Sequence, residues 1–175
     1  MNPGPSPGYI HSRLMKDWAS LGVYWGSGDE DWTTKLLAWF RAEGKKIGFD
    51  VYPDPDTPWH SEYLLDLVWC IEKGNAYAGL VLALESEWSQ TWSDILDDFD
   101  KLLDVKAPLK VLLCDPSSSQ IRDLPGHIGH QIREHQNRVP GEQYLVVAFD
   151  PKSVHAWTFD CDGNCAGLGT RPYPS

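Results

Sequence analysis

Two apolar runs separated by a short polar turn constrain this chain more than any other feature. The first run covers residues 63–72 and the second covers residues 77–88, with Lys73-Gly74-Asn75-Ala76 between them. Gly and Asn between two apolar runs are typical of the tight turn of a β-hairpin. We therefore predict two antiparallel strands, the second of which continues up to Trp88.

The segments around this hairpin alternate between helix and strand patterns. Helices are predicted at about 9–19, 31–43, 92–103 and 126–137, and further strands at 47–52, 109–114, 144–149 and 154–159. The 92–103 segment carries an apolar stripe at helical spacing, whereas 109–114 is apolar throughout, as a central buried strand is. The predicted fold class is α/β, with a central mixed β-sheet flanked by helices.

The length of 175 residues is that of a single domain with a substantial core. Residues 1–8 are rich in Pro and Gly and are predicted to form a flexible arm. Residues 161–175 are again rich in Gly and Pro and are predicted to be an irregular tail.

The charge balance limits the classes of partner. There are 15 Lys and Arg against 25 Asp and Glu, which gives a formal net charge of −10. Such a chain is poorly suited to loose electrostatic binding of nucleic acid, which requires Lys and Arg on the phosphates. The longest clean apolar run, residues 78–84, is too short to span a membrane, and the first residues do not resemble a secretory signal. We therefore expect a cytoplasmic protein without a membrane partner.

Three acidic residues interrupt the hairpin strands. Asp66 lies in the first strand, and Glu85 and Glu87 lie near the end of the second. Alternation along a strand places Glu85 and Glu87 on one face. With the turn at Gly74-Asn75, Asp66 is predicted to lie opposite Ala83 and diagonal to Glu85, on the same face.

The local sequence holds no Lys or Arg to neutralise these acids. Close carboxylates in a half-buried site must bind a proton or a counter-ion, and carboxylate ligands favour Mg²⁺ or Mn²⁺. The sequence thus predicts a metal site formed by Asp66, Glu85 and Glu87. The alternative from the same residues is a solvated strand end without a ligand.

The order of these elements resembles the PD-(D/E)XK nuclease superfamily, which has the restriction-endonuclease-like fold. The resemblance covers residues 29–149: a helix, a hairpin with Asp66 on one strand and Glu85-Ser86-Glu87 on the next, a helix and a buried strand. It implies that Asp66 and Glu85 bind the metal. Glu87 stands where the family most often has Lys, so no residue at this position can take the role of that lysine.

Lys101, on the following helix, is one candidate for that role. The helical wheel places it opposite the apolar stripe, which is also typical of a solvated surface lysine. The resemblance then implies catalytic roles for Asp66, Glu85, Glu87 and Lys101 in phosphodiester hydrolysis.

The predicted function is a metal-dependent nuclease that acts on DNA rather than RNA. Two alternatives remain open: an inactive member of the same fold that binds a protein or nucleic acid, and an unrelated acidic α/β protein that imitates the charge of nucleic acid. A protein partner and a homodimer are both compatible with the sequence.

Two weaker patterns complete the candidate sites. Cys161 and Cys165 could pair or bind a metal, but no second Cys/His pair at zinc-finger spacing accompanies them. His127, His130 and Glu134 share one face of a predicted helix. That face could be simply solvent-exposed, could bind a metal, or could contact phosphates.

Overall fold

The computed structural model describes residues 4–23, 28–55, 64–74 and 76–173, which form four helices and one seven-stranded sheet. The elements, in chain order, are α1 (Pro7–Leu21), α2 (Asp29–Lys46), β1 (Asp50–Tyr52), β2 (Leu67–Lys73), β3 (Ala76–Glu87), α3 (Trp92–Asp104), β4 (Leu109–Cys114), α4 (Leu124–Glu134), β5 (Gln143–Phe149), β6 (Ser153–Asp160) and β7 (Cys165–Pro172). Two positions of the predicted hairpin lie outside the described residues: its first residue, 63, and residue 75 in its turn.

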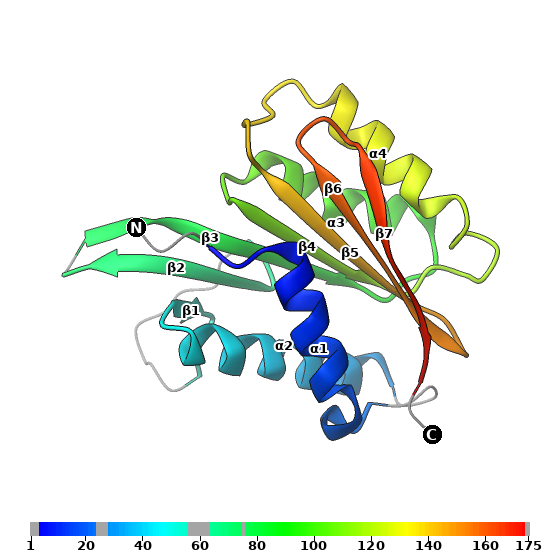
Figure 1. Ribbon diagram of the computed structural model, residues 1–175, viewed down its shortest axis with the longest axis horizontal. Coiled ribbons are helices and arrows are strands. Elements are labelled where there is room, and N and C mark those ends of the chain that lie inside the picture. Colours follow the sequence, from blue (N-terminus) through cyan, green and yellow to red (C-terminus); the bar gives the residue numbers. More distant parts are fainter. Residues whose placement is uncertain (1–3, 24–27, 56–63, 75, 174–175) are drawn as a thin grey trace.

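The sheet keeps the chain order from β1 to β7 (Figure 1). Strands β1, β2 and β3 are antiparallel, β3, β4 and β5 are parallel, and β5, β6 and β7 are antiparallel again. The parallel steps require the crossover helices α3 and α4, because two parallel neighbours cannot be joined by a tight turn. The predicted α/β class with a mixed sheet flanked by helices is confirmed.

Two apolar layers cover the two faces of the sheet. Helices α1 and α2 pack on one face through a core that is rich in aromatic rings, including Trp18, Trp32 and Phe149. Helices α3 and α4 pack on the other face around Phe99 and Ile128. Successive strand residues alternate between the layers, so the face that a β3 residue occupies decides which helices it meets.

The register of the β2–β3 hairpin differs from the prediction. Near the turn, Lys73 pairs with Ala76, but two irregularities along the hairpin shift the pairing so that Val68 lies opposite Ala83. The prediction that Asp66 lies opposite Ala83 is therefore wrong. Bulges of this kind insert unpaired residues in one strand, and they leave no clear signal in the sequence.

Both predicted irregular ends are more ordered than expected. Ser6 caps α1 by accepting a hydrogen bond from the Tyr9 backbone N–H, so residues 7 and 8 of the predicted arm are helical. The predicted tail contains β7, which pairs with β6 along its length. β7 escaped prediction because it is exposed at almost every position and contains two glycines, so it shows no alternation.

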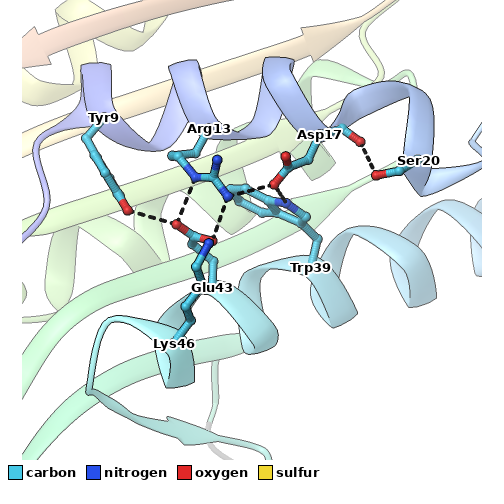
Figure 2. Close-up of polar contacts among 7 residues, drawn as sticks. All are labelled: Tyr9, Arg13, Asp17, Ser20, Trp39, Glu43 and Lys46. Carbon is cyan, nitrogen blue, oxygen red and sulfur yellow. Dashed lines mark hydrogen bonds and ion pairs between the residues drawn. The ribbon is translucent and has the colours of Figure 1, made fainter.

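A polar network joins α1 to α2 (Figure 2). Glu43 is only 4% exposed and accepts hydrogen bonds from Tyr9 Oη at 2.8 Å and Arg13 Nε at 3.1 Å. Arg13 also contacts Asp17, which accepts a hydrogen bond from Trp39. Each buried charge in this helix pair therefore has a partner.

Candidate acidic site at the start of β2 and the end of β3

Asp66 lies immediately before β2, where the chain enters the sheet. Its Oδ2 atom accepts hydrogen bonds from the Ser86 backbone N–H at 2.8 Å and from Ser86 Oγ at 2.6 Å. These two bonds fix the Asp66 carboxylate against β3. Asp66 is also near enough to Glu85 for its charge to raise the pKa of the Glu85 carboxyl group.

Glu85 is the most enclosed acid of the site. It lies on β3 between Leu84 and Ser86, opposite Leu112 of β4, and is 2% exposed. Its Oε1 atom is buried and has no hydrogen-bond partner among the residues that the structure describes. Burial, and next the charge of Asp66, raise the pKa of Glu85 to about 8. An unpaired buried carboxyl group is unfavourable, so this oxygen is a place where a ligand can be stabilised.

Lys101 reaches this carboxyl group from α3. Its Nζ atom lies 3.8 Å from Glu85 Oε1 and 2.5 Å from Asp98 Oδ1. The hydrogen bond to Asp98 raises the pKa of Lys101, which therefore stays charged. Lys101 is exposed, as a lysine opposite the apolar stripe is expected to be, but its long side chain brings the ammonium group to the acids.

Glu87 takes a separate position at the end of β3. One of its carboxylate oxygens accepts a hydrogen bond from the Ser89 backbone N–H at 2.6 Å. Burial raises the pKa of Glu87, and the nearby Asp98 carboxyl group adds to this rise. Glu87 is therefore engaged with the residues that follow β3 and with α3.

The three predicted metal ligands do not form a ready-made cage. Across the described ranges, no group of three or more His, Cys, Asp or Glu side chains is placed so that it could hold a metal ion. Asp66 and Glu85 offer carboxylate oxygens, the donors that Mg²⁺ and Mn²⁺ favour, and the buried Glu85 Oε1 atom has no hydrogen-bond partner among the described residues. A metal ligand role for Glu87 stays a prediction.

The weaker patterns of the sequence lie elsewhere. Cys161 and Cys165 are free thiols. The ring of His127 lies 4.4 Å from that of Trp92, with His127 itself exposed on α4. The same absence of a metal-holding group applies to these residues within the described part of the chain.

Sequence reasoning missed two contributors to the site, Ser86 and Asp98. Ser86 positions Asp66, and Asp98 pairs with Lys101. The spacing of Asp98 and Lys101, three residues apart on a helix, was a usable signal for the second pair.

Comparison with known proteins does not extend this description. No protein-family model matches the chain, and a search of curated proteins finds no match. In the part of the chain that is described, no helix is both long and apolar enough to traverse a membrane.

Proposed function

We propose that this protein is a metal-dependent nuclease that hydrolyses the phosphodiester bonds of DNA in preference to those of RNA. The observation that carries the proposal is the buried Glu85 Oε1 atom, which has no hydrogen-bond partner among the described residues, with Asp66 held nearby by Ser86 and Lys101 at 3.8 Å. The arrangement of α2, the antiparallel strands β1 to β3, α3 and the parallel strand β4 supports it, because these elements follow the order on which the nuclease resemblance rests.

The side chains have distinct roles in this proposal. Asp66 and Glu85 would hold the divalent cation, and Ser86 keeps Asp66 in place. A cation bound there lowers the pKa of a bound water and offsets the negative charge that develops on the phosphate. Lys101 can approach a phosphate oxygen because its side chain is half exposed. The raised pKa of Glu87 suits a carboxyl group that takes up or releases a proton.

Cleavage of supercoiled plasmid DNA tests the proposal directly. We expect nicking or linearisation with Mg²⁺ or Mn²⁺, none with EDTA, and at least a hundredfold loss in Asp66→Asn and Glu85→Gln, as is typical when a main electrostatic group of a site is removed. Asp97→Asn, an exposed change on α3, is the matched control. Parallel assays on RNA test the preference for DNA. Metal-independent cleavage, or full activity in both site variants, would contradict the proposal.

A specific observation favours a second candidate, a binding module without catalysis. Glu87 stands where the resemblance leads us to expect lysine and is held by the Ser89 backbone N–H, and α3 presents Asp94 and Asp98 beside the site. Negative charge around a site opposes the approach of a polyanion. Metal-dependent stabilisation of the protein without cleavage of DNA or RNA would favour this candidate.

A further inference from the structure

The contacts of Lys101 suggest a role that precedes any reaction. Its ammonium group lies between two carboxyl groups, at 3.8 Å from Glu85 Oε1 and 2.5 Å from Asp98 Oδ1. It is thus the positive charge that faces the buried Glu85 oxygen among the described residues. The separation from Glu85 exceeds a hydrogen bond, so Lys101 leaves Oε1 unsatisfied, and the two groups form an ion pair when Glu85 is ionised.

The surroundings of Lys101 leave space beside its side chain. Its side chain is 49% exposed, whereas Glu85 is fixed within β3 and 2% exposed. Lys101 also lines an apolar cavity of about 420 Å³ together with Leu64, Leu65 and Val105. The ammonium group can therefore leave Glu85 without disturbing the core, and it can keep its shorter contact with Asp98.

We propose that Lys101 is an exchangeable counter-ion, which occupies the place beside Glu85 that a divalent cation takes and competes with that cation. This inference rests on the proposed function for the identity of the cation. It adds that the metal-free protein holds its own substitute charge, and that cation binding frees Lys101 to face a phosphate.

The test is Mn²⁺ binding, measured by the electron paramagnetic resonance signal of free Mn²⁺, on folded wild-type and variant proteins. Lys101→Gln removes the competing charge and is expected to tighten Mn²⁺ binding about two- to fivefold, the range that an exposed ion pair supplies. Lys101→Arg keeps the charge and is expected to bind as the wild type does. Lys106→Gln, the same charge change at an exposed residue lining a different cavity, is the control.

The expected signature is a pair of opposite effects. Lys101→Gln should bind Mn²⁺ more tightly and yet cleave DNA less, and adding Glu85→Gln should abolish the tighter binding. A lysine that only supported the local structure would lower both quantities. Mn²⁺ binding that is unchanged or weaker in Lys101→Gln, or absent from both proteins at millimolar Mn²⁺, would overturn the inference. Tighter binding without cleavage by any protein would instead overturn the proposed nuclease and leave the exchange intact.

Discussion

At the scale of single residues, Glu85 lies in surroundings that are unfavourable for its charged form. It is enclosed by a sheet and a helix, its Oε1 atom has no hydrogen-bond donor among the described residues, and Asp66 lies nearby. A protein that only needed a stable strand here would gain from an apolar or neutral side chain. Such a local conflict with stability is expected where a site serves a ligand.

The raised pKa of Glu85 predicts how stability depends on pH. Because its folded pKa is about 8, above the ordinary value of 4.5, this residue favours the folded state at low pH and loses that contribution as the pH rises from about 4.5 towards 8. Glu85→Gln mimics the protonated form. We expect it to increase the free energy of unfolding by about 2–4 kcal/mol at pH 8, with almost no effect at pH 4.5.

Thermal unfolding without divalent cations measures this difference across the pH range. At pH 8 the melting temperature of Glu85→Gln should exceed that of the wild type by about 5 °C or more. Glu134→Gln, at an exposed position on α4, should show no such trend. A constant difference between Glu85→Gln and the wild type from pH 4.5 to 8 would mean that Glu85 is ionised in the folded protein throughout.

At the same scale, the sequence identified Asp66, Glu85 and Lys101 but could not fix their contacts. Asp66 and Glu85 were detectable because acids in apolar strands are unusual. Lys101 was ambiguous, since a helical wheel gives the direction of the Cα–Cβ bond and not the reach of a long side chain. The role of Ser86 could not be predicted, because nothing in the local sequence shows that its hydroxyl donates a hydrogen bond to an acid twenty residues earlier.

At the scale of elements, α1 and α2 depend on one buried acid. Burial alone would raise the pKa of Glu43, but hydrogen bonds from Arg13 and Tyr9 outweigh it and hold the pKa below the ordinary value. A depressed carboxyl pKa stabilises the folded state above the unfolded value, and the stabilisation is lost as the pH falls through the folded pKa.

Glu43→Gln should therefore lower the free energy of unfolding by about 1–3 kcal/mol at pH 7, because it removes the buried charge that pairs with Arg13 Nε, while the contact of Arg13 with Asp17 remains. The difference should shrink steadily below pH 4.5. Urea unfolding at pH 7 and at pH 3 checks this expectation, again with Glu134→Gln as the control. An effect of equal size at both pH values would assign the loss to packing and not to charge.

The packing of α4 on the β6–β7 turn depends on two glycines. A Cβ atom on Gly129 would lie 2.9 Å from the Gly163 carbonyl oxygen, and Gly163 itself has φ of 73°. Gly126, on the same helix, has open space around it. Close approach of the two backbones thus explains why position 129 is glycine, but it does not explain the glycine at position 126.

These two positions give a matched pair of substitutions. Gly129→Ala should lower the free energy of unfolding by about 1–3 kcal/mol, because the helix must move away from the turn. Gly126→Ala should raise it by about 0.4–1 kcal/mol, since alanine restricts the unfolded chain without a clash. Chemical denaturation of both variants measures the two effects. If both substitutions changed the free energy of unfolding in the same direction, α4 would not approach the turn as described.

Elements were predictable to different degrees. The α3 helix and the β4 strand were predicted within one residue at either end, because each has one dominant pattern and clear end signals. The hairpin was correct in kind, but its register depended on irregularities that follow from tertiary packing. The β7 strand exists because β6 offers a backbone edge, a cause that lies outside its own residues.

At the scale of the whole molecule, charge and site must be considered together. The net charge of −10 and the acidic side chains of α3 around Lys101 both oppose a polyanionic substrate. If the protein acts on DNA, a divalent cation therefore has to contribute to binding as well as to cleavage. This requirement separates the proposed nuclease from a protein that binds nucleic acid through a basic surface.

The consequence can be measured with a fluorescently labelled duplex and Ca²⁺, a divalent cation that commonly supports binding without hydrolysis. We expect weak binding in EDTA with little dependence on salt, because few phosphates are neutralised by Lys or Arg. Addition of Ca²⁺ should strengthen binding at least tenfold, as measured by fluorescence anisotropy. The Asp66→Asn/Glu85→Gln double variant should lose this gain, whereas Asp97→Asn should keep it. Tight binding in EDTA that weakens steeply with salt would instead reveal a basic DNA-binding surface, and the acidic site would then need another substrate.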